Sequence, residues 1–239
     1  MKYITYFSFL LISISMNAQT IHQSRFLDAD SVFSTKLTGE TFIEKRYKGD
    51  PFFTNDWVKG AVLLTSGDTV SGKRIKYNGL LDEIIWLNPF NLRKVKLDKS
   101  YISEFWYKNI QGKTIHFKRI NVNDLSAVQQ PAIFVEVALE GKVSLYIQHK
   151  FRVFDTENFY EDAKQYSIEL IEPSTMYYIK LPSNKYIVAK SIKRNTLLNL
   201  FPEQKKDIVK LLKLNHLNFK SESSIIKVID KLNKELFVK

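Results

Sequence analysis

The chain has 239 residues, of which 44% are hydrophobic, and its formal net charge at pH 7 is +11. This length and hydrophobicity favour a folded core over disorder, in one large domain or two small ones. The sequence contains no cysteine, which excludes disulfides, thiolate metal sites, a cysteine nucleophile and a lipid-modified cysteine. The 17 Phe, 12 Tyr and 3 Trp residues, with only 8 Gly and 6 Pro, favour strands that pack large flat side chains.

The first 18 residues have the pattern of an export signal. Lys2 supplies a positive start, residues 4–14 form an apolar run, and the sequence Met-Asn-Ala that ends at Ala18 fits a cleavage site. The alternative is an N-terminal membrane anchor, but this run is short for a full span and no later stretch of about 18 apolar residues follows. We therefore predict a signal peptide at 1–18 and a mature chain that begins at Gln19 and has no transmembrane span.

The first regular strand pattern begins near residue 56. Residues 19–55 show no clean period and predict a lead-in followed by the first strands. Residues 58–64 then alternate, a tight turn follows, and 69–77 run back, which predicts a hairpin. The apolar parity of the returning strand changes at Gly72, so we expect a one-residue bulge at this glycine.

The stretch GDTVSGKR, at 67–74, differs by one residue from a phosphate-binding loop. Arg74 stands where that motif requires Ser or Thr, so no hydroxyl is present to hold magnesium. A phosphate loop also lies between a strand and a helix, whereas both flanks here have the strand pattern. We interpret the stretch as part of a hairpin and predict no nucleotide site.

The rest of the chain up to residue 190 is also rich in strand patterns. The predicted strands are 82–87, 92–97, 101–107, 114–120, 133–139, 143–147, 176–181 and 185–189. The segment Asp155–Lys164 is too polar for a core strand and predicts a loop or one helical turn. The fold class is therefore mostly β (α+β), with antiparallel hairpins in one or two small barrels or a barrel-plus-sheet. This β-rich domain spans 56–190, as one unit or as subdomains at about 56–110 and 111–190.

The period becomes helical in the C-terminal segment, 191–239. Pro202 suits a first helical position, and Ser221 suits the N-cap of a last helix. One apolar stripe of that helix consists of Ile225, Val228, Ile229, Leu232 and Leu236. From Lys185 to the end, 13 basic residues stand against 5 acidic ones, a net charge of +8. This charge would attract an anionic surface, or it belongs to a solvated, lysine-rich helical face.

Two resemblances follow from these patterns. Residues 58–107, with a Gly67-Asp68 turn and a bent strand at Gly72, resemble the small Sm-like or PRC-type barrels; such barrels host unrelated functions, so no site is carried over. The whole layout resembles a group of uncharacterised exported proteins of Bacteroidota. That resemblance implies an envelope location and no assigned activity. It rests on Ala18-Gln19, on Gly60, Gly67-Asp68 and Gly72, on Glu140–Lys142 and on the helical tail.

Side chains that could carry chemistry have structural explanations. Among the four histidines, His116 and His149 lie in different hairpins of the β region, without a third ligand that would indicate a metal site. The acidic cluster of Asp155, Glu157, Glu161 and Asp162 lacks calcium-loop spacing and is typical of a solvated loop. The aromatic and basic stretch 101–119 is either a stacking platform or sheet packing, and strand alternation favours packing. We therefore predict no catalytic, cofactor-binding or metal residue.

The function expected from these patterns is binding rather than catalysis. We predict an exported, periplasmic or outer-envelope protein that contacts an envelope protein or an anionic surface through a strand edge or an aromatic patch. No nucleic-acid partner is expected. One alternative is a carboxylate-based hydrolase of envelope or carbohydrate substrates, although more arguments favour a protein that is not an enzyme. The other is a peripheral membrane protein attached through its basic C-terminal helices.

Overall fold

The fold is described from a computed structural model, which describes Leu37 and residues 39–121, 132–161 and 164–237. The predicted signal peptide, 1–18, and the first part of the predicted lead-in, up to residue 36, lie outside the described residues. The 14 strands are β1 (Gly39–Thr41), β2 (Tyr47–Lys48), β3 (Val58–Leu64), β4 (Thr69–Asn78), β5 (Glu83–Leu87), β6 (Lys94–Leu97), β7 (Ile102–Lys108), β8 (Thr114–Ile120), β9 (Ile133–Leu139), β10 (Ser144–Gln148), β11 (Phe151–Glu161), β12 (Lys164–Pro173), β13 (Met176–Lys180) and β14 (Tyr186–Ala189). A short 3-10 helix spans Lys99–Tyr101, and the α-helices are α1 (Arg194–Leu200), α2 (Lys205–Leu214) and α3 (Glu222–Glu235).

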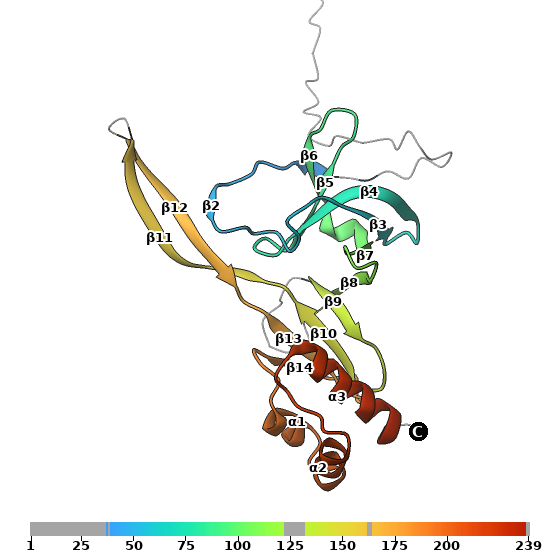
Figure 1. Cartoon of the computed structure of the whole chain (residues 1–239). Coiled ribbons are helices and arrows are strands. Elements are labelled where there is room, and N and C mark those ends of the chain that lie inside the picture. The colour runs from blue at the N-terminus through green and yellow to red at the C-terminus, as the bar shows by residue number, and fades with distance from the viewer. Residues whose placement is uncertain (1–36, 38, 122–131, 162–163, 238–239) are drawn as a thin grey trace, which may run out of the picture.

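The predicted class, mostly β with C-terminal helices, is confirmed. Eleven strands form one antiparallel sheet in the order β1-β6-β5-β4-β3-β7-β8-β9-β10-β13-β14. A smaller sheet has the order β11-β12-β2, and β2 is its one parallel member. The large sheet runs continuously through both proposed subdomains, because β8 pairs with β7 on one side and with β9 on the other. Figure 1 shows the three helices beside β9, β10, β13 and β14, and the β11–β12 hairpin extending away from the rest.

The strands predicted to close a small barrel belong to an open sheet instead. A barrel built from β3 to β7 would need β6 and β7 to pair with each other. However, β7 lies between β3 and β8, and β6 lies between β5 and β1. Both edges that would have to meet are therefore occupied, and within the described ranges the strand pairing closes no barrel.

The β3–β4 hairpin confirms the predicted bulge and contains no phosphate loop. Gly60 pairs with Lys73 and Val62 with Val70, so β4 has one more residue than β3 at this point. Gly72 lies in this bulge with a φ of +74°, a conformation that glycine adopts without steric cost. Lys73 lies within β4 and is buried, and no helix begins near it.

Two apolar cores lie on one face of β9. The side chain of Phe134 is fully buried in the first core, with residues of β3 to β8 such as Phe105 and Phe117. Ala138 is four residues further along the same face and packs against the second core, which β10, β13 and the helices build. Glu136 lies between them on that face, so the two cores meet at a carboxylate.

The helices cover the second core, and the apolar stripe of α3 provides much of it. Ile225, Val228, Ile229 and Leu232 are buried there, against β-strand residues such as Val143 and Leu145. The side chain of Asn233 accepts a hydrogen bond from the backbone of Val143 and donates one to it, each 2.8 Å long. Ser221 caps α3 as predicted, whereas Pro202 lies before α2, which begins at Lys205.

The polar segment predicted to be a loop or a helical turn is part of a long hairpin. β11 and β12 pair over most of their length, from Phe151 with Pro173 to Glu161 with Lys164. The prediction from Asp155–Lys164 was wrong because it assumed that a strand of this length needs an apolar face against a core. Here the backbone hydrogen bonds between two mostly exposed strands replace that requirement.

Candidate functional site

The β11–β12 hairpin, which we call the arm (151–161 and 164–173), carries the densest group of exposed aromatic side chains. Of the 13 large apolar side chains exposed in the described residues, five lie in the arm: Val153 (43% exposed), Phe154 (53%), Phe159 (44%), Tyr160 (75%) and Tyr166 (43%). Single exposed apolar residues are ordinary on protein surfaces, but a contiguous group of them is typical of an interaction site.

Two of these rings form a cross-strand pair on one face of the arm. Phe159 pairs with Tyr166 in the antiparallel register, and their rings stack with centroids 5.6 Å apart. Glu157 and Ile168 are the next opposed pair on that face, whereas Tyr160 points to the other face. Phe154 is the extra residue at a register shift near the base of the arm. Both faces therefore present an aromatic ring to solvent.

The base of the arm is fixed to the rest of the protein. Ile171 is buried, and Gly49 lies so close to it that an added Cβ would be 2.8 Å from its Cγ1 atom. The backbone N–H of Phe151 donates to the carbonyl of Gly79. On the small sheet, Lys48 forms an ion pair with Glu157 at 2.7 Å. These contacts anchor the base, while the distal part has no other element packed against it in Figure 1.

The arm is acidic although the chain is basic. Residues 151–173 contain six acidic and two basic side chains, a net charge of −4 against +11 for the chain. The predicted acidic cluster lies in this segment, and two of its members, Asp155 and Glu157, are on β11. Asp162 lies outside the described residues, and Glu161 is described only as the last residue of the strand. The cluster thus belongs to a hairpin and not to the solvated loop that the sequence predicted.

A second candidate lies among the helices. An open pocket of about 740 Å³ is bounded by the start of α1, the end of α2 and the segment that leads to α3. Its lining residues are Arg194, Leu212, Lys213, His216, Leu217, Asn218, Phe219 and Lys220. Four of these eight side chains are Arg, Lys or His, and none is acidic. The pocket is therefore suited to an anion.

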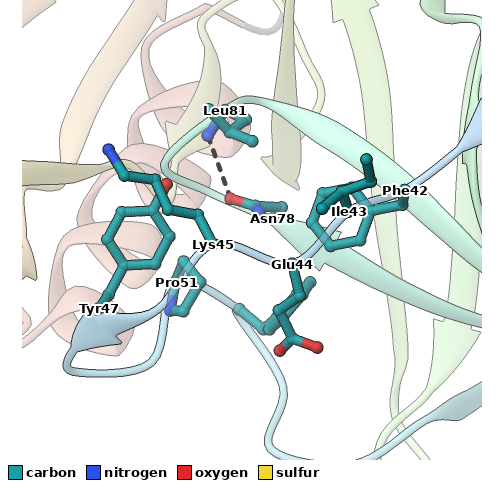
Figure 2. A pocket seen from close by; sticks show the side chains of 9 residues that line it. Phe42, Ile43, Glu44, Lys45, Tyr47, Pro51, Asn78 and Leu81 are labelled. Carbon is teal, nitrogen blue, oxygen red and sulfur yellow. Dashed lines mark hydrogen bonds between the residues drawn. The ribbon is translucent and has the colours of Figure 1, made fainter.

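A second cavity, drawn in Figure 2, is too small for an organic ligand. It has about 20 Å³ of space, roughly enough for one water molecule. It lies between the segment 42–47 and the β4–β5 turn, and Glu44 is the one acidic side chain that lines it. Within this turn the side chain of Asn78 accepts hydrogen bonds from the backbone N–H groups of Leu80 and Leu81.

The buried carboxylate of Asp82 has a structural role. It accepts a hydrogen bond from the Tyr77 hydroxyl at 2.6 Å and one from the backbone N–H of Phe134 at 3.2 Å, and it forms an ion pair with Lys99. Burial raises the pKa of the Asp82 carboxyl, and the positive charge of Lys99 opposes that rise. With these partners, Asp82 ties the β4–β5 turn to the start of β9.

Each of the two histidines of the β region pairs with a glutamate. His116 lies 2.8 Å from Glu104, and His149 lies 2.6 Å from Glu136. Within the ranges that the structure describes, no group of three or more His, Asp or Glu side chains could hold a metal ion. Burial raises the pKa of the Glu222 carboxyl near His149, at the first residue of α3.

Three of the five aromatic rings in the stretch 101–119 lie in the core, whereas Tyr101 is 52% exposed. Phe105, Tyr107 and Phe117 are buried in the first core, so they cannot form a stacking platform at the surface. The packing interpretation is confirmed for these three rings. Sequence reasoning instead missed the arm aromatics, whose irregular spacing gives no strand period. It also missed the basic pocket, whose residues come from three separate segments.

Comparison of the chain with family models, with curated proteins and with solved structures finds no match in any of the three. Among the described residues no helix is long and apolar enough to cross a membrane.

Proposed function

We propose that this protein is a non-catalytic binding module of the cell envelope, and that its arm docks a partner protein. The observation that carries this proposal is the exposure of four aromatic side chains on a hairpin that projects from the fold. Rigid aromatic rings supply large contact areas at low entropic cost, and they are enriched in protein interfaces. The surface of the partner would be basic, because the sequence 151–173 carries a net charge of −4.

The geometry of the arm supports docking in two ways. β11 is the outer strand of the small sheet, so one backbone edge is open for strand addition. The stacked rings of Phe159 and Tyr166 lie on one face, with half-buried Ile168 beside them. An isolated two-stranded hairpin is only marginally stable in water, so a partner that covers the arm would also stabilise it.

The alternatives have less support. A hydrolase of the proposed kind needs two convergent carboxylates in one pocket, and neither pocket described above contains two. Attachment to lipid through the apolar stripe of α3 has less support, because four of the five residues of that stripe are buried in the second core.

The envelope location rests on the N-terminal pattern. N-terminal sequencing of the protein from fractionated cells is expected to begin at Gln19, and an intact Met1 in the cytoplasmic fraction would contradict export.

A photo-cross-linking experiment tests the docking. A benzophenone amino acid is placed at position 160, where the side chain is 75% exposed, and for comparison at position 110, where Ile110 is fully exposed on the β7–β8 turn. In intact producing cells we expect one defined adduct from position 160 and none from position 110. An adduct of twice the chain mass would identify a second copy as the partner, and any other mass a different protein.

The decisive control uses matched pairs of serine substitutions. Phe159→Ser with Tyr166→Ser removes the stacked pair, and this variant should lose the adduct. Phe90→Ser with Leu92→Ser removes two side chains that are 70% and 68% exposed on the β5–β6 turn, and this variant should keep it. An adduct that persists in the first variant, or no adduct from position 160 at all, would overturn the proposal.

A further inference from the structure

The basic pocket has the size and composition of a ligand site. Its volume of about 740 Å³ lies in the range of roughly 300–1,000 Å³ that is typical of small-molecule pockets. Arg194 comes from the first residue of α1, Lys213 from the end of α2, and Lys220 from the segment before α3. Three of the four basic side chains thus come from the stretch 213–220, and the packing of α1 adds Arg194 to them.

These charges are not balanced by the protein. Within the described residues, no ion pair involves Arg194, Lys213 or Lys220. The contrast is α3, where Lys231 pairs with Glu235 at 2.9 Å and Lys234 with Asp230 at 2.7 Å. Other lysines of the basic tail, such as Lys206 and Lys227, also form no ion pair within the described residues, but at the pocket four basic side chains line one surface. Their mutual repulsion would be relieved by a bound anion.

Helix electrostatics explains only one of these cations. Lys213 is in the last turn of α2, where a positive charge complements the helix dipole. Lys220 lies just before the Ser221 N-cap of α3, at the helix end where a positive charge is unfavourable. Arg194 belongs to α1 and lies away from that C-terminal turn in the sequence. A bound anion would explain why these charges line one pocket.

His216 occupies a backbone position that favours glycine. Its φ is +49°, and it follows the C-cap of α2 at Asn215. The backbone N–H of His216 donates to the carbonyl of Lys213, and that of Leu217 donates to the carbonyl of Leu212. This is the Schellman arrangement, in which the left-handed residue is usually glycine. An exposed histidine at this position costs backbone strain, which a ligand contact would justify.

The floor of the pocket is apolar. Leu212 is buried in the second core, and Leu217 and Phe219 are partly buried against it. A ligand held by the cations at the rim would therefore place any further group against aliphatic and aromatic carbon. A bare inorganic ion would leave this surface in contact with water.

We propose that the basic pocket binds a phosphate ester that carries an apolar group. A phosphate monoester has a charge of about −1.5 to −2 at neutral pH and three acceptor oxygens, which suits several converging donors. The guanidinium of Arg194 donates two hydrogen bonds to such a group, and Lys213, His216 and Lys220 add further donors. The apolar group of the ester packs on Leu217 and Phe219. This site lies on the helices and is independent of the arm.

Calorimetric titration of the full chain with hexyl phosphate tests the proposal, because this ester is soluble and has the required parts. We expect saturable binding at one site, at least tenfold tighter than that of inorganic phosphate. Equal affinity for the two compounds would overturn the role of the apolar floor. Binding to phosphatidylglycerol vesicles without binding to hexyl phosphate would overturn the proposal in favour of a membrane surface.

Two pairs of substitutions distinguish binding in the pocket from a general attraction of the anion by the positive charge of the protein. Arg194→Gln with Lys220→Gln should weaken hexyl phosphate binding at least tenfold. Lys206→Gln with Lys227→Gln removes the same charge from exposed lysines that do not line the pocket, and affinity should change less than twofold. Similar losses in both variants would overturn the assignment.

His216→Gly gives a second and opposite readout. Glycine adopts this backbone conformation without strain, so we expect the midpoint of thermal unfolding to rise by about 3 °C. We expect hexyl phosphate affinity to fall at least threefold in the same variant, because the imidazole donor is lost. A variant that is more stable and binds equally well would show that His216 has no role in the site.

Discussion

The carboxylate of Glu136 lies 2.6 Å from the imidazole of His149 at the point where the two apolar cores meet. Their side chains are only 11% and 15% exposed, and the ring of Phe53 lies over the imidazole with centroids 4.0 Å apart. The contact gives each of these two buried polar side chains a hydrogen-bond partner, which the surrounding apolar side chains could not provide. It therefore places a paired polar group between the two apolar cores of the continuous sheet.

Truncation of this histidine is expected to destabilise the fold strongly. His149→Ala leaves Glu136 buried without its partner, and we expect the free energy of unfolding to fall by about 3 kcal/mol. His116→Ala is the matched control, since His116 pairs with Glu104 at 2.8 Å but the two side chains are 36% and 24% exposed. That change should cost less than about 1 kcal/mol. Urea unfolding at pH 7 measures both, and equal losses would contradict a special role for the buried pair.

The buried carboxyl of Asp82 should make stability depend on pH. Because burial raises its pKa in the native state, the native protein binds more protons than the unfolded chain between the unfolded and the native pKa. Stability therefore falls as the pH rises through this interval, which begins near the ordinary Asp value of about 3.9.

Comparison with an Asp82→Asn variant isolates this effect. The wild-type protein should lose stability relative to the variant as the pH is raised from about 4 to 7. Urea unfolding at one-unit intervals of pH measures the difference. A difference that grows in favour of the wild type with rising pH would show that Lys99 and the two hydrogen bonds lower the native pKa instead.

Two glycines should respond differently to alanine. A Cβ at Gly79 would lie 2.2 Å from the backbone carbonyl oxygen of His149, and neither backbone can move without disturbing the base of the arm. We expect Gly79→Ala to cost about 3 kcal/mol. Gly72 has open space around it, so Gly72→Ala should cost only the strain of its φ of +74°, about 1 kcal/mol. Thermal unfolding of the two variants ranks these costs, and the reverse order would contradict the close approach at Gly79.

Removal of the arm aromatics should leave stability nearly unchanged. Phe159→Ser with Tyr166→Ser replaces two exposed rings, and we expect a change of less than about 1 kcal/mol in the free energy of unfolding. Phe105→Ala is the contrast, because its ring is fully buried and stacks on Phe117 with centroids 4.5 Å apart. That change should cost about 4 kcal/mol. A large loss from the serine pair would mean that the arm serves the fold and not a partner.

The hairpins were predictable from the sequence because apolar residues recur with a strand period along them. β8 and β9 span the predicted ranges, and the bulge at Gly72 was found from a change in apolar parity. The stripe of α3 was equally clear, since four of its five residues are buried in the second core and Leu236 is partly buried against it. Local periodicity reports which side of an element is apolar, whichever core that side later packs against.

The two candidate sites were not predictable for the same physical reason. Asp155–Lys164 has no apolar face because the arm packs against little, so its strand pairing left no periodic signal. Arg194 and Lys220 are 26 positions apart in the chain and line one pocket only after α1, α2 and α3 have packed together. The barrel prediction was wrong for the same reason. The outer edges of β6 and β7 pair with β1 and β8, so they are not free to pair with each other, and the period of a single strand does not reveal this.

By itself the sequence determined the strand and helix periods, the basic tail and the lack of any cysteine chemistry, because these depend on each residue and its near neighbours. Only the tertiary structure decided that the sheet stays open, that a hairpin projects with its aromatics exposed, and that four basic side chains line one pocket. Those features depend on which surfaces meet after the chain has folded, and spacing along the chain does not encode that.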